Sequence, residues 1–139
     1  MINLSKIKEE IDTIKLILLK VIPETKLIYL FGSYGTQRQT DDSDIDIAIF
    51  CEKKIPELLL WNVQQELAVA LNRDVDLVDL LSIDTVFAFQ ILSTGTCVLA
   101  SNKNEDNRLQ MQIGSEYLRL NEGREAILKD IKKRGQIRE

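Results

Sequence analysis

The feature that most constrains the fold of this 139-residue chain is the alternation in residues 44–49, which read Asp-Ile-Asp-Ile-Ala-Ile. An alternation with a period of two residues predicts a β-strand. In such a strand Ile45, Ile47 and Ile49 would share one side of a sheet. Asp44 and Asp46 would lie side by side on the other. The fold must therefore bury one face of a sheet while presenting two carboxylates on the opposite face.

Apolar strand-like segments alternate with helical segments along the rest of the chain. Further strands are predicted at residues 26–31, 75–80 and 96–100. Helices are predicted over residues 4–21, stopped by Pro23; 55–72, with Pro56 in the first turn; 83–93, with Ser82 as the candidate N-cap; and about 107–134, interrupted by Gly114 and Gly123. This order predicts an α/β fold in one domain, residues 1–139, with the long last helix packed outside the sheet.

The chain contains no histidine, which excludes Ser-His-Asp and Cys-His catalysis and the histidine-containing zinc sites. Its two cysteines, Cys51 and Cys97, are far apart in the sequence and are expected to be reduced thiols. No apolar run is long enough to cross a membrane, and no secretory signal begins the chain. These observations predict a cytoplasmic protein without membrane contact.

The net charge of −4 is distributed unevenly along the chain. Residues 38–84 contain four basic and eleven acidic residues, whereas residues 101–139 contain nine basic and seven acidic ones. A surface of this kind argues against direct nucleic-acid binding. A bound cation is one common relief for the local excess of acids in the middle of the chain.

The candidate functional residues follow or lie on the predicted strands. Gly32 and Ser33 come directly after an apolar strand, where a sharp turn with free amides suits a phosphate group. Asp44 and Asp46 lie on the next strand, and Asp76 interrupts a later apolar one. Three carboxylates in one place repel one another, and Mg²⁺, with its preference for oxygen ligands, would relieve that repulsion.

This set of residues predicts nucleotidyl transfer. Two Mg²⁺ ions would stabilise the attacking and leaving oxygens of an in-line displacement, and Asp76 could accept the proton of the attacking hydroxyl. The identity of the third acid stays open at this point. Asp74 would share a face with Asp76, whereas Asp79 would not.

The Gly32-Ser33 pair, the Asp44-Ile45-Asp46 segment and Asp76, within a motif core at residues 27–80, resemble the DNA polymerase β-like nucleotidyltransferase superfamily. The short chain and its closing helix are similar to the minimal nucleotidyltransferase branch, the MntA-type antitoxins of HEPN/MNT toxin–antitoxin pairs. The resemblance implies a small mixed sheet flanked by helices. It also implies that the three aspartates bind Mg²⁺ and that Gly32 and Ser33 bind the triphosphate of ATP. The expected activity is transfer of AMP to a hydroxyl, that of a tyrosine, on a HEPN ribonuclease toxin, which neutralises the toxin.

The sequence departs from the family pattern after the Gly-Ser start. Family members often have a small residue, a basic residue and glycine there, whereas this chain has Gly35, Thr36 and Gln37, with Arg38 two places late. Arg38 is therefore expected to be a surface residue. Haloacid-dehalogenase-like phosphatases also have an Asp-x-Asp pair, but Gly-Thr follows it there, and this chain has Ile47-Ala48.

Two other functions remain open from the sequence alone. An antitoxin could neutralise its toxin by contact alone, through the amphipathic C-terminal helix, with catalysis lost or secondary. A nucleotidyltransferase could instead modify a small molecule. Such enzymes usually have a further substrate-binding domain, for which this chain is too short.

Overall fold

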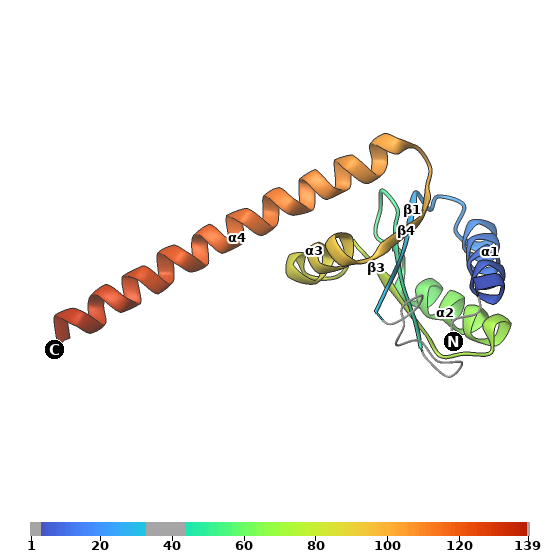
Figure 1. Ribbon diagram of the computed structural model, residues 1–139, viewed down its shortest axis with the longest axis horizontal. Helices are drawn as coiled ribbons and strands as arrows, with labels where there is room; N and C mark the ends of the chain where they lie inside the picture. Colours follow the sequence, from blue (N-terminus) through green and yellow to red (C-terminus); the bar gives the residue numbers. More distant parts are fainter. Residues whose placement is uncertain (1–3, 33–43, 139) are drawn as a thin grey trace.

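The computed structural model of the protein describes residues 4–32 and 44–138. Its helices and strands follow one another in the order α1 (Leu4–Val21), β1 (Leu27–Phe31), β2 (Ile45–Phe50), α2 (Glu57–Leu71), β3 (Val75–Asp79), α3 (Thr85–Thr94), β4 (Thr96–Ala100) and α4 (Lys103–Arg138). Figure 1 shows α1 and α2 on one side of the sheet and α3 on the other. The alternation of helices and strands expected from the sequence is thus confirmed.

The four strands form one mixed sheet in the order β3-β2-β1-β4. The central strand β1 runs antiparallel to both of its neighbours, β2 and β4. The strands β2 and β3 are parallel, and the register places Ile45 opposite Val75 and Asp46 opposite Asp76. A parallel pair requires a crossover connection, which α2 supplies.

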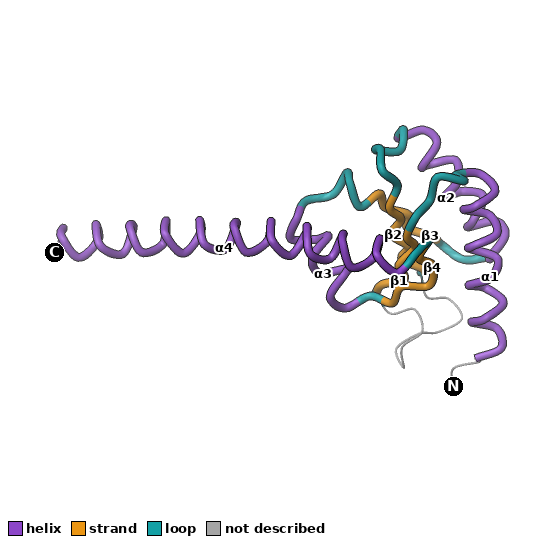
Figure 2. Tube along the Cα trace, turned by 90° about the horizontal axis from the view of Figure 1, so that it is seen from above, coloured by secondary structure: helices purple, strands orange, loops and turns teal. Residues whose placement is uncertain are grey.

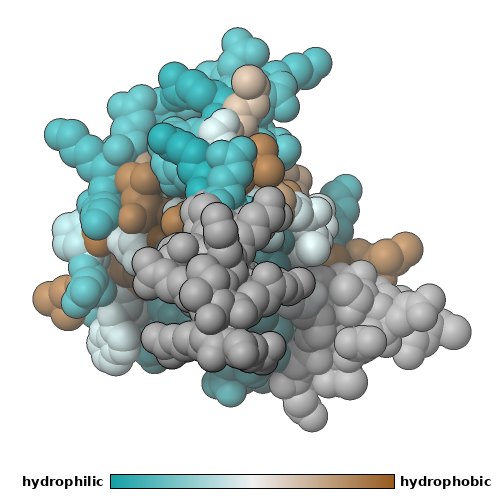
Figure 3. Space-filling model, turned by 90° about the vertical axis from the view of Figure 1, so that its left-hand side faces the viewer, coloured by the Kyte–Doolittle hydropathy of each residue, from teal (hydrophilic) through white to brown (hydrophobic). Residues whose placement is uncertain are grey.

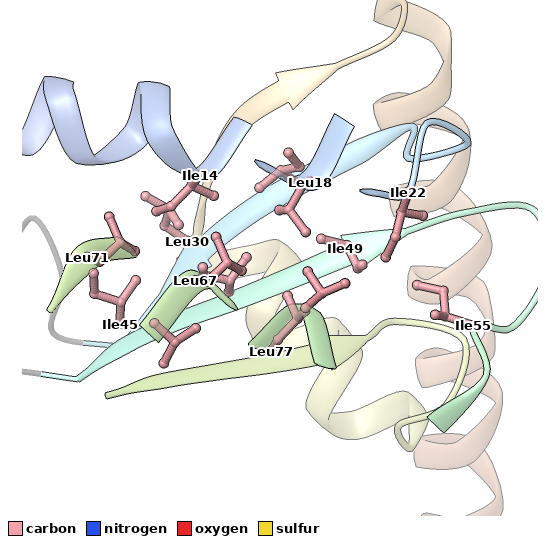
Figure 4. Close-up of a cluster of buried hydrophobic side chains, with 14 of the residues drawn as sticks. Ile14, Leu18, Ile22, Leu30, Ile45, Ile49, Ile55, Leu67, Leu71 and Leu77 are labelled. Carbon is pink, nitrogen blue, oxygen red and sulfur yellow. The ribbon is translucent and has the colours of Figure 1, made fainter. Parts of the chain in front are cut away.

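Alternate residues of the strands enter two separate hydrophobic clusters. On the side of α1 and α2, the isoleucines of β2 pack with Ile14, Leu18 and Leu67, and all of these side chains are fully buried. Figure 4 shows the side chains of this cluster pointing toward one another between the two helices and the sheet. On the side of α3 and α4, Tyr29 and Ala48 pack with residues of these helices. The prediction that Ile45, Ile47 and Ile49 share one side of the sheet is therefore confirmed.

The boundaries of three helices differ from those expected. Pro56 is the N-cap of α2 and does not lie in its first turn. The N-cap of α3 is Asp84, whose carboxylate accepts a hydrogen bond of 2.8 Å from the amide of Phe87, so the expectation of Ser82 as the cap is wrong. The last helix begins at Lys103, because the Asn102 side chain accepts hydrogen bonds of 3.0 Å from the amides of residues 104 and 105.

The long helix α4 packs outside the sheet, as expected, and runs on through Gly114 and Gly123. Its first half lies against α3, where the rings of Phe89 and Tyr117 stack with their centroids 4.0 Å apart. The buried hydroxyl of Tyr29 donates a hydrogen bond to Asp106, and burial is the main cause that raises the pKa of Tyr29 far above its usual value. The second half of α4 extends away from the sheet (Figures 1 and 2). Within the described ranges, none of the helices has the length and apolar character needed to cross a membrane.

A buried carboxylate, Asp79, fixes the connections at one end of the sheet. Its side chain is 1% exposed and accepts hydrogen bonds from the amide of Ile55 (2.9 Å), the amide of Leu81 (3.0 Å) and the hydroxyl of Ser82 (3.1 Å). It thereby joins the loop before α2 to the turn after β3. The Ser82 hydroxyl is committed to this carboxylate, which leaves the N-cap position of α3 to Asp84.

We expect Asp79→Ala to lower the free energy of unfolding by roughly 3 kcal/mol, because three donors would lose their common acceptor in the protein interior. The matched control is Asp84→Ala, which removes one exposed helix cap and should cost about 1 kcal/mol. Urea denaturation of both variants measures the difference. Equal losses in the two variants would contradict the bridging role given to Asp79.

Candidate active site

The turn that follows β1 requires glycine at position 32. Gly32 has a φ of +76°, in the region that residues with a Cβ rarely adopt. A Cβ built on this residue would overlap the carboxylate of Asp46. The chain can therefore turn at this point only because glycine leaves room for the Asp46 side chain, and the backbone of the turn lies directly against that carboxylate.

Asp46 is the centre of the predicted carboxylate group. On β2 it is paired with Phe31 of β1 on one side and with Asp76 of β3 on the other. Asp44 lies two residues earlier on the same side, and both Asp44 and Asp76 are exposed. Burial raises the pKa of the Asp46 carboxyl, and the negative charges of Asp76 and Asp44 raise it further. We call Asp44, Asp46 and Asp76 the carboxylate group.

The register distinguishes among the three candidates for the third acid. Asp76 lies directly beside Asp46, and its charge acts on Asp46. Asp74 precedes β3 and is exposed, and its backbone carbonyl accepts a hydrogen bond of 2.9 Å from the amide of Ile45. Asp79 is buried in its own hydrogen bonds at the far end of β3. The geometry therefore favours Asp76 over the other two as the partner of Asp46.

Part of the predicted site lies outside the described residues. This applies to Ser33, the second residue of the predicted phosphate-binding turn. Arg38, which is expected to be a surface residue and not a ligand, also lies outside the described residues. The described part of the site thus consists of Gly32 and the carboxylate group.

The carboxylate group offers the oxygen ligands of a site for a hard divalent cation, but its three side chains do not converge on one ion position. Among the residues whose side chains the structure describes, 4–32 and 44–122, no three His, Cys, Asp or Glu side chains lie close enough together to hold one ion. The donors available are carboxylate oxygens alone, the ligands that Mg²⁺ prefers. In the same part of the chain, no Lys or Arg forms an ion pair with Asp44, Asp46 or Asp76. A bound cation would therefore relieve the repulsion among the three carboxylates, which no described basic side chain neutralises.

Sequence reasoning missed an aromatic pair beside the carboxylate group. The ring of Phe31 meets the ring of Phe87 edge to face, with centroids 5.8 Å apart and an interplanar angle of 83°. Phe31 is the partner of Asp46 across the β1–β2 pair. No signal in the sequence joins α3 to this site, because the contact depends on how α3 crosses the sheet.

A cavity of about 650 Å³ lies away from the carboxylate group. Its lining includes Lys26, Cys51 and Ile55. Lys26 precedes β1 and Cys51 follows β2, whereas Gly32 follows β1 and Asp44 precedes β2. The cavity is thus at the opposite end of the sheet from the carboxylate group.

The raised pKa of Asp46 makes the stability of the cation-free protein depend on pH. Because the folded protein holds this proton more firmly than the unfolded chain, the contribution is fully present below the unfolded-state pKa and is lost as the pH rises through the raised value. We expect Asp46→Asn to raise the melting temperature at pH 7 and the gain to disappear near the ordinary aspartate pKa of about 4. Thermal unfolding across this pH range, with the exposed Asp12→Asn on α1 as control, measures the effect. An equal gain in melting temperature at pH 7 and near pH 4 would contradict this expectation.

Comparison with known proteins places this chain in a family. Residues 5–105 match the family described as polymerase beta, nucleotidyltransferase. The chain is also 40% identical over 110 residues to the protein adenylyltransferase MntA of Shewanella oneidensis, and the match covers 79% of this chain and 78% of that protein.

Solved structures of toxin–antitoxin complexes are similar over nearly the whole chain. A crystal structure of a toxin–antitoxin with AMP-PNP superposes with a TM-score of 0.79 at 37% identity, covering 87% of this chain and 97% of that one. A structure of the tri-AMPylated Shewanella oneidensis HEPN toxin in complex with its MNT antitoxin gives a TM-score of 0.76 at 34% identity, covering 90% and 98%. The mixed sheet flanked by helices therefore belongs to a fold that this chain shares with these antitoxins. The chain is a member of the polymerase β nucleotidyltransferase family, in the branch that contains the protein adenylyltransferase MntA.

Proposed function

We propose that this protein is a Mg²⁺-dependent protein adenylyltransferase that transfers AMP from ATP to a tyrosine hydroxyl of a HEPN-domain toxin and thereby neutralises it. The observation that carries the proposal is the placement of Asp46 between the Gly32 turn and Asp76. The relatives support it, because one is named a protein adenylyltransferase and others are complexes with AMP-PNP or with an AMPylated HEPN toxin. Since Cys51 and Cys97 are free thiols, we assign the activity to the cytoplasm.

The turn at Gly32 is assigned to the phosphates of ATP. A positive φ without a side chain leaves backbone amides open to an anion, and the hydroxyl of Ser33 would add one hydrogen bond. Asp44, Asp46 and Asp76 would hold Mg²⁺, in two ions, next to this turn. When bound, the metal supplies charge neutralisation for the triphosphate and for the oxygens that attack and leave.

The transfer is a single displacement at the α-phosphorus of ATP. The acceptor hydroxyl oxygen forms a bond to this phosphorus, and the bond from phosphorus to the oxygen that bridges to the β-phosphate breaks. Pyrophosphate leaves with the electron pair of that bond. Asp76 is exposed beside Asp46 and is assigned to accept the proton of the attacking hydroxyl.

We expect Asp44→Asn to reduce AMP transfer by at least about 100-fold, because it removes a ligand charge from the proposed cation site. The fold should remain, since Asp44 is exposed and belongs to a repulsive group. The measurement is the intact mass of a HEPN-domain toxin after incubation with the protein, ATP and Mg²⁺. Wild-type protein should add whole AMP units to that mass.

The same variant separates catalysis from contact. If the Asp44→Asn protein adds no AMP yet still neutralises the toxin, binding alone is sufficient and the proposed mechanism is wrong. If the variant fails to fold, as measured by circular dichroism and thermal unfolding, Asp44 has a structural role that the geometry does not assign to it.

We expect Gly32→Ala to reduce transfer at least about 10-fold, because the added Cβ would displace the Asp46 carboxylate and strain the turn by about 1–2 kcal/mol. The matched control is Gly114→Ala on α4, where an added Cβ meets nothing within 4 Å. That substitution should raise helix stability by about 1 kcal/mol and leave transfer unchanged. Steady-state transfer rates and thermal unfolding of both variants make the comparison. A Gly32→Ala protein with full activity would show that the turn does not position Asp46 for transfer.

A further inference from the structure

Two charged side chains, Glu10 and Arg73, form an ion pair inside the protein. The described charged residues lie mostly at the surface, and the face seen in Figure 3 is mainly hydrophilic, with apolar side chains in small patches. In this pair, Nε of Arg73 lies 2.9 Å from Oε2 of Glu10, and the two side chains are only 3% and 9% exposed. By comparison, the side chains of the ion pair between Lys26 and Glu52 are 26% and 66% exposed.

The stability of the fold does not by itself account for a buried ion pair. The loss of hydration of two charges offsets most of their attraction, and apolar side chains of similar volume often give a protein that is equally stable or more stable. Glu10 stands where an apolar residue would serve, because the buried residues of α1 are Glu10, Ile14 and Leu18, spaced by one helical turn. What an ion pair adds is a fixed position of one segment relative to another.

Arg73 lies in the connection between α2 and β3, residues 72–74, which we call the α2–β3 link. Its amide donates a hydrogen bond of 3.3 Å to the carbonyl of Ala68 in α2. At the other end of the link, the carbonyl of Asp74 accepts a hydrogen bond of 2.9 Å from the amide of Ile45. Ile45 separates the first two aspartates of the carboxylate group, and the third lies two residues beyond the link. The link therefore joins β2 to β3 at the carboxylate group.

Helix α1 connects the same region to β2 from the apolar side of the sheet. Ile14, one turn after Glu10, belongs to the same buried cluster as Ile45. Figure 4 shows Ile14, Leu71 and Ile45 at the same end of this cluster. Since α1 packs against β2 and its Glu10 binds the α2–β3 link, the ion pair holds the start of β3 in place relative to β2.

The carboxylate group acts against this arrangement. Asp46 and Asp76 lie opposite each other across the β2–β3 pair, and the negative charge of Asp76 contributes to the raised pKa of Asp46. Without a cation, their repulsion favours separation of the two strands at this end. At the other end, the hydrogen bonds of Asp79 fix β3. The Glu10–Arg73 ion pair supplies the corresponding restraint beside the carboxylate group.

We propose that the Glu10–Arg73 ion pair is a positioning pair for the cation site, which keeps Asp46 and Asp76 side by side before Mg²⁺ binds. Neither Glu10 nor Arg73 is a ligand of the ion. Because the strands are already paired, Mg²⁺ has only to reorient side chains, and its affinity is higher than for strands that must first be brought together. This inference rests on the proposed function and adds to it two residues that act on the site through the backbone.

The test replaces both charges at once, so that no unpaired charge is left in the interior. We expect Glu10→Leu/Arg73→Met to keep the fold and a melting temperature near or above that of wild type. Its Kd for Mn²⁺, an ion that binds the same oxygen ligands as Mg²⁺, should rise about 10-fold. Electron paramagnetic resonance of the free ion measures this Kd in the full chain without nucleotide. At saturating metal, the kcat of AMP transfer should return to within about twofold of wild type.

Two further variants separate the ion pair from a general loss of contacts. Arg73→Lys keeps a positive charge opposite Glu10 and should hold the Mn²⁺ affinity within about threefold of wild type. The matched control is Lys26→Met, which removes the ion pair that joins the residue before β1 to Glu105 of α4. It lies at the opposite end of the sheet and should leave the affinity unchanged. A loss in Lys26→Met or Arg73→Lys as large as in the double variant would overturn the positioning role.

The fold of the double variant is checked first, by circular dichroism and thermal unfolding. A Mn²⁺ affinity of the folded double variant within about twofold of wild type would overturn the proposal. If the apolar pair does not fold, Glu10→Gln/Arg73→Gln, which keeps hydrogen-bonding groups at both positions, replaces it in the same measurement. If neither double variant folds, the pair is required for folding itself, and the positioning role is overturned.

Failure of the proposed function has a different signature. Wild-type protein that binds no Mn²⁺ would overturn the cation site, and the positioning pair with it. Wild-type protein that binds Mn²⁺ but adds no AMP to a HEPN-domain toxin would overturn the transfer reaction alone, because metal binding is measured without the toxin. Wild-type protein that binds Mn²⁺ and adds AMP, together with a double variant that behaves as wild type, would overturn the positioning pair alone.

Discussion

The structure depends on the parallel pairing of β2 and β3 in the register that sets Asp46 beside Asp76. Because parallel neighbours need a crossover, this pairing requires α2, and α2 with α1 buries the isoleucines of β2. The burial in turn determines which side chains face the other way. A shift of one residue in register would move Asp46 into the apolar cluster and Ile45 out of it. The hydrophobic side of the sheet therefore fixes the position of the carboxylates on the opposite side.

The crowded carboxylates lower the stability of the sheet at the site itself. Burial and neighbouring negative charges raise the pKa of Asp46, and the turn before it has a backbone conformation that only glycine adopts easily. The compensation comes from elsewhere in the same strands. Ile45, Ile47 and Ile49 are fully buried, and Asp79 at the other end of β3 satisfies three donors. A site with crowded negative charge is thus held by well-packed residues a few positions away in the same strands.

Much of this could be predicted from the sequence, because periodicity reports which face of an element is buried. The four strands, the first helix and the Asp44–Asp46 pair follow from that signal alone. Strand register does not follow from periodicity, because it is the pairing of Val75 with Ile45 that sets Asp76, and not Asp74, beside Asp46. The N-cap of α3 does not follow from periodicity either. Ser82 and Asp84 are both good N-cap residues, and the buried Asp79 decides between them by binding the Ser82 hydroxyl. The contact between Phe31 and Phe87 depends on the crossing of α3 over the sheet, which no local pattern encodes.

The inner strand β1 connects the Gly32 turn to helix α4. It ends in the Gly32 turn, and in its middle the buried hydroxyl of Tyr29 donates to Asp106 in the first turn of α4. The Gln110 side chain donates to the same hydroxyl at 3.1 Å, so two turns of α4 are fixed to β1. The position of the Gly32 turn relative to the first turns of α4 is therefore set by hydrogen bonds to the strand that ends in that turn. Because an in-line displacement requires the reacting groups to keep a constant geometry, a turn anchored in this way suits the phosphate-binding role proposed for it.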